Sequence, residues 1–320
     1  MQSDRQIGFR WRERCLACIC ILLLAACAPL PDGQGGYIAL FVLPVTPTAM
    51  PALQDTPEAT ATAPVETPPP IATATPTGPR ILGDNPNAPL IAIDPGHGGR
   101  DVGAVHRDAQ GRVDWRESEV NLQMALRLRD LLLARGYRVF LTREDDRALN
   151  AAGEDVNGDG ITDHADELQA RVDAINAVGA DLLLSIHQNS FYFGPGDPAE
   201  DVGGTMTLYC RDRDFGDKNL RLARLVQAEV LRAFGNYGYA IRDRGVVADT
   251  NLEVPGSSGA YLVLLGPESE RIARPSQMPG ALCEVLFITN PVEAKLARDP
   301  ILIARLAIAF ADAVDAYFMP

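Results

Sequence analysis

Short apolar runs alternate with longer amphipathic stretches from about residue 86 to the end of the chain. The runs LIAID (90–94), YRVFLT (137–142) and DLLLSIH (181–187) have the length and composition of buried strands. Between them, apolar positions recur every three or four residues, which is typical of helices that cover a sheet. The alternation predicts an α/β fold, namely a single domain with a mostly parallel central sheet flanked by helices.

The amphipathic stretches predict four helices. The first covers residues 118–136, with Gly136 at its end. Its apolar face consists of Val120, Met124, Leu128 and Leu131. The other helices are expected at about 167–178, 217–234 and 302–318, and two further strands at 204–210 and 281–287.

A different pattern precedes this domain. Residues 1–26 contain four arginines followed by an apolar run from Leu16 to Ala26, which is too short to span a bilayer comfortably but suits a signal peptide. The run ends in LAAC (24–27), which resembles the lipobox of bacterial lipoproteins. We expect a lipoprotein signal peptide and a lipid-modified Cys27, with ordinary cleavage or an uncleaved anchor as the alternatives.

Residues 45–77 are rich in Pro, Thr and Ala and offer no periodic apolar face. Such a segment is expected to be a disordered linker, and about thirty residues at roughly 3.1 Å each reach about 100 Å. The chain therefore divides into a signal peptide (1–26), a lipid-anchored linker (27–85) and a folded domain (86–320). We expect an exported lipoprotein anchored to a membrane of the cell envelope, acting on a target in the cell wall.

Charge and cysteine content narrow the function further. The formal net charge is −13, and removal of the signal peptide, which carries +2, leaves −15. Nucleic acid is therefore excluded as a partner, because phosphate binding requires concentrated Lys and Arg. The folded domain contains only Cys210 and Cys283, which form either one disulfide or two isolated buried thiols.

Two of the four histidines stand at the ends of apolar strands. His97 follows the first strand in the sequence IDPGHGG, and His187 follows the third. The carboxyl ends of parallel strands share one edge of a sheet, so the two imidazoles could hold zinc together with one carboxylate. Glu117 and Glu119 begin the next helix and are both candidates. The alternatives are a loop histidine bonded to backbone and a carboxylate favoured by the helix dipole.

A further carboxylate, Glu284, lies inside the apolar strand ALCEVLF. A buried carboxylate is costly unless it is paired, protonated or used in chemistry, so a functional role is expected. Asp94, at the end of the first strand, either orients a metal ligand or caps the loop.

Six segments resemble the zinc-dependent N-acetylmuramoyl-L-alanine amidases, which hydrolyse bacterial peptidoglycan. In order, they are IDPGHGG, ESEVNLQMALRLRDLL, YRVFLTR, LQARVDAIN, DLLLSIHQN and CEVLFITNPVEAKL. The resemblance runs from about residue 88 to the C-terminus. It implies that His97, Glu117 and His187 bind zinc and that Glu284 is catalytic. Glu117 is preferred to Glu119 because the family's ligand lies four residues before the Asn of an Asn-Leu pair.

The resemblance implies metal-assisted hydrolysis of the amide bond between the MurNAc lactyl group and L-alanine. Glu284 would accept a proton from water and return it to the departing amine. The chain departs from the family at Ser118, where Lys is common, and at Leu286, where Gly is common. An insertion at 266–280 could cover or gate the cleft, and an unknown activator protein is a further candidate partner. The rival interpretations are a zinc peptidase acting on the stem peptide and a non-catalytic wall-binding module.

A second metal site is predicted in an insertion at 150–167. The sequence DVNGDGITDHAD resembles an EF-hand-like calcium loop, with Gly160 at position 6. Its ligands would be Asp155, Asn157, Asp159, the carbonyl of Ile161, Asp163 and Asp166. The alternative is a solvated acidic turn. His164, within the loop, and His106 are expected at the surface.

Overall fold

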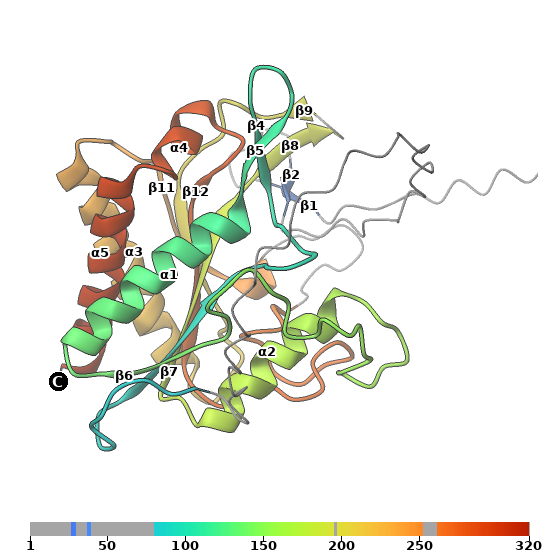
Figure 1. Ribbon diagram of the computed structural model, residues 1–320, viewed down its shortest axis with the longest axis vertical. Helices are drawn as coiled ribbons and strands as arrows, with labels where there is room; N and C mark the ends of the chain where they lie inside the picture. Colours follow the sequence, from blue (N-terminus) through green and yellow to red (C-terminus); the bar gives the residue numbers. More distant parts are fainter. Residues whose placement is uncertain (1–26, 30–36, 40–79, 195–196, 252–260, 320) are drawn as a thin grey trace, which may run out of the picture.

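The computed structural model describes residues 27–29, 37–39, 80–194, 197–251 and 261–319 (Figure 1). The predicted signal peptide and most of the predicted linker lie outside the described residues. Among the helices that are described, none is both long and apolar enough to cross a bilayer.

A six-stranded sheet runs through the domain. Its order is β11-β10-β12-β7-β3-β6, and only the β10–β12 pair is antiparallel. The strands are β3 (Leu90–Pro95), β6 (Arg138–Leu141), β7 (Leu182–Asn189), β10 (Thr205–Tyr209), β11 (Asp243–Ala248) and β12 (Gly280–Phe287). The predicted mostly parallel sheet is confirmed. β7 extends two residues beyond His187, so this histidine lies within the strand rather than after it.

Helices cover both faces of the sheet (Figure 1). One face carries α1 (Glu117–Ala134), α3 (Gly216–Tyr237) and α5 (Pro300–Phe318), whose apolar residues form one core cluster with the sheet. The opposite face carries α2 (His164–Val178) and the segment 261–280, which form the second cluster. The short helix α4 (Pro291–Leu296) follows β12. The flanked sheet explains why the strands are apolar on both sides.

The buried face of α1 follows the predicted spacing with one shift. Val120, Met124 and Leu128 are buried, but the next fully buried residue is Leu132 and not Leu131. Leu131 is only partly buried against the same cluster.

The start of α2 lies three residues before the predicted position. Asp163 caps the helix by accepting from Ala165 N at 2.6 Å, and Asp166 accepts from Asp163 N at 2.8 Å. This reciprocal capping box satisfies backbone donors that a helix start leaves unpaired, which favours the earlier beginning.

Smaller sheets complete the fold. A hairpin of β4 (Val105–Arg107) and β5 (Val113–Arg116) lies between β3 and α1 in the chain. A second small sheet contains β1 (Cys27–Pro29), β2 (Tyr37–Ala39), β8 (Phe191–Gly194) and β9 (Asp197–Pro198). A 3-10 turn, η1 (Asp249–Asn251), follows β11.

The two cysteines of the folded domain are free and buried in different core clusters, Cys210 in the α2 cluster and Cys283 in the α1 cluster. Burial raises the pKa of each thiol to about 12. Of the two alternatives, the structure therefore shows isolated thiols.

The 266–280 insertion is fastened to α2. Arg274 contacts Asp173 at 2.7 Å, and the Gln169 side chain accepts from Ala273 N at 3.0 Å. Met278 is buried in the second core cluster. The segment forms part of the layer on this face of the sheet. A role in covering or gating the cleft stays a prediction.

Candidate metal centre

Strand register brings two of the predicted site residues side by side. Glu284 of β12 is the Cα partner of His187 on the adjacent parallel strand β7. Neighbouring strands are about 4.8 Å apart, so the two side chains leave the sheet at the same level. His97 lies two residues beyond the end of β3, which pairs with the other edge of β7.

The side chains of His97, Glu117 and His187 converge in one cluster. One donor atom from each lies within 4.8 Å of the others, and no other group of three potential ligands is found among the residues that the structure describes. Glu117 Oε1 lies 3.1 Å from His97 Nε2 and 3.2 Å from His187 Nδ1. Two imidazoles and one carboxylate, largely shielded from water, are a donor set that zinc prefers in hydrolytic enzymes.

The structure distinguishes the two glutamates at the start of α1. The Glu117 side chain is completely buried, and its oxygens accept from Ala104 N and Gln188 N, each at 2.9 Å. Glu119 is 41 % exposed and pairs with Arg116 at 2.9 Å. Only Glu117 is placed within reach of the histidines.

Glu284 lies beside this cluster, at the position paired with His187 in the sheet. It is 3 % exposed, and its Oε2 has no hydrogen-bond partner among the residues that the structure describes. Burial raises the pKa of this carboxyl well above its usual range, and the neighbouring negative charge of Glu117 raises it further. A carboxyl group with such a pKa can both accept and donate a proton, which is the property that general acid–base catalysis requires.

Asp101, which the sequence interpretation missed, orients His97. Its Oδ2 lies 2.8 Å from His97 Nδ1, so Nε2 is the ring atom that faces Glu117. A carboxylate behind a ligand histidine is the usual outer partner in zinc sites. The spacing of four residues after His97, within a glycine-rich turn, is the signal that could have identified it.

His164 was expected at the surface, but it is partly buried and lies 3.6 Å from Asp101. Burial lowers its pKa to about 4. The helix start at His164 carries its side chain toward this carboxylate. His106 is also only partly exposed, because its ring stacks on Trp115 with 5.6 Å between centroids and its Nδ1 lies 2.6 Å from Asp114.

Two glycines leave room for the proposed ligands. A Cβ on Gly96 would lie 2.2 Å from the His187 ring. A Cβ on Gly103 would lie 2.6 Å from Glu117 Oε2 and 2.7 Å from His97 Cδ2. The absence of side chains at these positions is therefore required for the ligands to converge.

The hydrogen bonds of Asp94 go to residues outside the three-residue cluster. It is buried and accepts from Thr142 Oγ1 at 2.7 Å, Ser185 Oγ at 2.8 Å and Arg171 Nη1 at 2.9 Å. Burial opposes ionisation, yet Arg171 and these hydroxyl groups hold its pKa below the usual value.

The predicted calcium loop has a different organisation. Asp155 accepts from Gly158 N and Gly160 N, each at 2.9 Å, and Asp159 accepts from Ile161 N at 2.8 Å. Asp166 accepts from the backbone at both ends of the loop. These carboxylates form turns with their own loop, as in the alternative of an acidic turn, and calcium binding stays a prediction.

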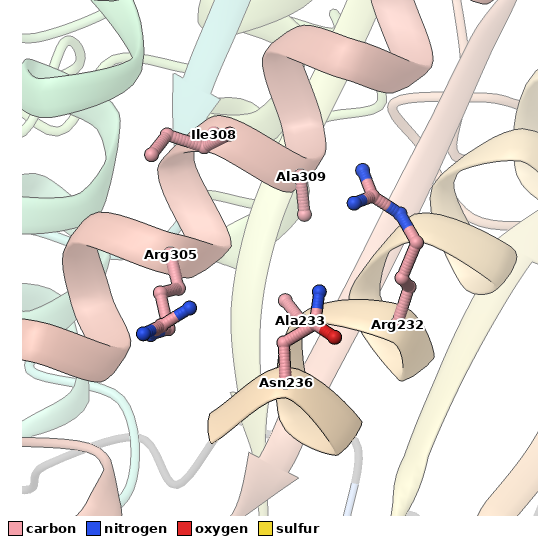
Figure 2. A pocket seen from close by; sticks show the side chains of 6 residues that line it. All are labelled: Arg232, Ala233, Asn236, Arg305, Ile308 and Ala309. Atoms are coloured by element: carbon pink, nitrogen blue, oxygen red, sulfur yellow. The ribbon is translucent and has the colours of Figure 1, made fainter. Parts of the chain in front are cut away.

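A shallow surface cavity of about 120 Å³ lies between α3 and α5 (Figure 2). It includes Arg232 and Arg305, but Arg232 already pairs with Asp312 at 2.6 Å. None of the predicted site residues lines it.

Comparison with known proteins gives a consistent result. The family model Amidase_3, described as N-acetylmuramoyl-L-alanine amidase, matches residues 91–316. The germination-specific N-acetylmuramoyl-L-alanine amidase of Bacillus subtilis (strain 168) is 32 % identical over 66 % of this chain and 72 % of its own length. The amidase AmiA of Escherichia coli (strain K12) is 26 % identical over 72 % of this chain and 76 % of its own length.

Among solved structures, the CwlD amidase from Clostridioides difficile in complex with the GerS lipoprotein matches with a TM-score of 0.53 and 25 % identity. The match covers 72 % of this chain and 98 % of that one. An N-acetylmuramoyl-L-alanine amidase from Clostridium difficile 630 matches with a TM-score of 0.51 and 27 % identity over 72 % of this chain and 97 % of that one.

Proposed function

We propose that this chain acts by a zinc-dependent mechanism with a glutamate as the general base. The chain belongs to the N-acetylmuramoyl-L-alanine amidase family of bacterial cell-wall hydrolases and is an amidase of peptidoglycan. The bond cleaved is the amide between the MurNAc lactyl group and L-alanine. The observation that carries the mechanism is the convergence of His97, Glu117 and His187 next to the buried Glu284, whose Oε2 meets no hydrogen-bond partner in the described part of the chain.

The three clustered side chains are the proposed zinc ligands. His97 would bind through Nε2 because its Nδ1 is bonded to Asp101. When bound, zinc supplies Lewis acidity that polarises a carbonyl and lowers the pKa of water from 15.7 to about 7. Bonds from Ala104 N and Gln188 N keep the Glu117 carboxylate in place before an ion arrives.

Glu284 is the proposed general base and acid. Its carboxylate accepts a proton from the attacking water while the new C–O bond forms at the amide carbon. The same proton then passes to the amide nitrogen as the C–N bond breaks, and L-alanine leaves with a free amine. The raised pKa of Glu284 suits this double role because the proton must be held between the two steps.

The test is digestion of purified peptidoglycan with and without a chelator, beside Glu284→Gln and the exposed-site control Glu268→Gln. We expect stem peptides with a free L-alanine amine, identified by mass spectrometry. Their yield should fall about 10²- to 10⁴-fold in Glu284→Gln, the usual contribution of a general base, and should depend on zinc. Cleavage within the stem peptide would support a zinc peptidase instead. Binding without any cleavage in zinc-replete protein would support a wall-binding module.

We further propose the domain order of the sequence interpretation: signal peptide (1–26), lipid-anchored linker (27–85) and catalytic domain (86–320). The LAAC motif at Cys27 supports export and anchoring in the cell envelope. A Cys27→Ser variant should leave the membrane fraction and lose the lipid mass. Retention in the membrane would contradict lipid anchoring.

Two additional partners are proposed on narrower grounds. The complex of a similar amidase with a lipoprotein supports a protein partner for this chain, which co-purification from membranes would test. The DVNGDG sequence supports calcium binding with a dissociation constant of about 10⁻⁴ to 10⁻³ M. Calorimetry should then show calcium binding that is lost in Asp155→Asn, and equal heats for both proteins would contradict it.

A further inference from the structure

Two buried arginines bind the backbone of the turn that carries His97. Arg143 donates from Nε to Pro95 O and from Nη2 to Gly96 O, each at 2.9 Å. Arg171 donates from Nη1 to Pro95 O at 3.0 Å and from Nη2 to His97 O at 2.7 Å. The carbonyls of three consecutive residues are thus held by the guanidinium groups of two buried arginines.

The turn needs such donors for a physical reason. β3 ends at Pro95, so the next carbonyls are outside the regular pairing of the sheet although they are buried among polar groups. His97 has a φ of 63°, the only positive value among the described residues other than glycine. A side chain in this region is strained by about 1 kcal/mol or more, and a buried carbonyl without a donor costs about 1–3 kcal/mol. The arginines offset both costs and fix one backbone path.

Arg143 also connects two elements of the proposed metal centre. Its Nη2 donates to Ser118 O at 2.8 Å as well as to Gly96 O. Ser118 directly follows Glu117 at the start of α1. One guanidinium group therefore joins the His97 turn to the helix that presents Glu117.

Arg171 is itself held from two sides. Asp94 accepts from its Nη1 and Glu167 accepts from its Nε, each at 2.9 Å. The charge of Arg171 is thereby paired within the fold, and its Nη2 donates to the turn. This arrangement gives Asp94 a role that acts through Arg171.

We propose that Arg143 and Arg171 are positioning residues of the metal centre, which hold the His97 turn against the start of α1 so that His97 and Glu117 meet before an ion binds. This inference rests on the proposed zinc site. Lysine could not replace either residue, because an ammonium group lacks the planar fork that reaches several carbonyls at once. The contribution is to zinc affinity, since an ion then binds donors that are already assembled.

The chain offers a matched control in Arg213. This partly buried arginine also donates to backbone carbonyls, Leu265 O at 3.0 Å and Gly266 O at 2.8 Å, but in the segment packed on α2. Its replacement by lysine removes comparable bonds without touching the His97 turn. It therefore reports the general effect of losing a carbonyl-binding arginine.

The experiment measures zinc affinity of the whole protein by competition with a chromogenic chelator, and stability of the metal-free protein by urea unfolding. Arg143→Lys and Arg171→Lys should each weaken zinc binding about 10- to 100-fold, the usual effect of losing an outer partner of a ligand. Arg213→Lys should leave affinity within about twofold of wild type, at a similar loss of stability.

Arg143→Gln extends the test if a buried lysine prevents folding, because glutamine is neutral and keeps two donor hydrogens. It is expected to weaken zinc binding by a similar factor. Wild-type affinity in the Arg143 and Arg171 variants, or an equal loss in Arg213→Lys, would overturn the positioning role alone. A wild-type protein that binds no zinc would overturn the proposed metal centre itself.

Discussion

The His97 turn and the loop of residues 155–166 both carry candidate metal ligands, yet they are organised in opposite ways. In the first, donor atoms come from a turn, a helix start and a strand that are distant in sequence, and they lie within 4.8 Å of one another. In the second, carboxylates from one continuous loop accept hydrogen bonds from that loop's own backbone.

The two regions differ in whether local backbone amides can supply the hydrogen bonds that the polar side chains need. Asp and Asn readily bond amides two or three residues away, so a loop rich in them forms compact turns without an ion. Imidazoles and a carboxylate that converge from separate elements require a tertiary fold that keeps polar groups together against their desolvation cost. Convergence over long sequence distance is therefore the stronger indicator of function.

The largest effect is expected from the carboxylate of the convergent cluster. Glu117→Gln should lower zinc affinity and amidase activity by more than the ~100-fold typical of an outer partner, because it removes a proposed ligand. Zinc competition and peptidoglycan digestion measure both quantities. Glu119→Gln, two positions along the same helix and exposed, should change neither. Zinc binding that survives Glu117→Gln would contradict the role of Glu117 as a ligand. The His97 cluster would then no longer differ from the loop of residues 155–166 in its need for convergent donors.

The second-largest effect is expected from a side chain that enters the space between the proposed ligands. Gly96→Ala places a methyl group 2.2 Å from the His187 ring, so the imidazole must move. A displacement of about 1 Å can reduce catalysis by about 100-fold, and we expect a loss of this order in kcat. In Gly235→Ala, the new methyl group of α3 meets no atom within 4 Å. This control should keep full activity and gain up to about 1 kcal/mol of stability.

A substitution in the loop of residues 155–166 should lower the stability of the protein without changing its zinc affinity. Asp166→Ala removes the acceptor of Val156 N, Asn157 N and Asp163 N, at 2.7, 3.1 and 2.8 Å. We expect a loss of about 1–3 kcal/mol in urea unfolding of the metal-free protein. Zinc affinity of the folded variant should stay at the wild-type value, with the exposed Asp197→Ala as the control. A large loss of zinc affinity would show that the two regions are coupled.

The smallest effect is expected at His164, which belongs to the loop of residues 155–166 and lies 3.6 Å from Asp101, the carboxylate that orients His97. Burial lowers the pKa of His164 to about 4 from 6.5, so the unfolded chain binds more protons between these values. Stability from this group is then present above pH 6.5 and lost as the pH falls toward 4. In metal-free protein, His164→Gln should flatten the pH dependence of unfolding in this window by on the order of 1 kcal/mol. Parallel curves for variant and wild type would contradict a buried neutral imidazole.

The elements of the fold were predictable because their patterns are local. The apolar runs gave the strands β3, β6 and β7, and the three-to-four spacing gave the helices. The early start of α2 was missed because the capping carboxylates were interpreted as calcium ligands.

The residues that support the site were harder to predict. Arg171 lies three positions after Leu168 and four before Ile175, so it shares the apolar face of α2. A charged residue at such a position is a signal of a buried ion pair, here with Asp94. Arg143 directly follows the apolar run of β6, and nothing in its neighbourhood indicates that it is buried.

The sequence by itself determined the α/β class, the positions of most elements and the residue types available for chemistry, because periodicity and glycine-rich turns are properties of short segments. The residue pattern left Glu117 and Glu119 open, and the tertiary structure shows that Glu117 faces the histidines, as the family resemblance implied. The structure also decided that Glu284 stands beside His187. It also decided that two arginines hold the His97 turn. These outcomes depend on contacts between residues up to about a hundred positions apart, which only the packing of the sheet and helices brings together.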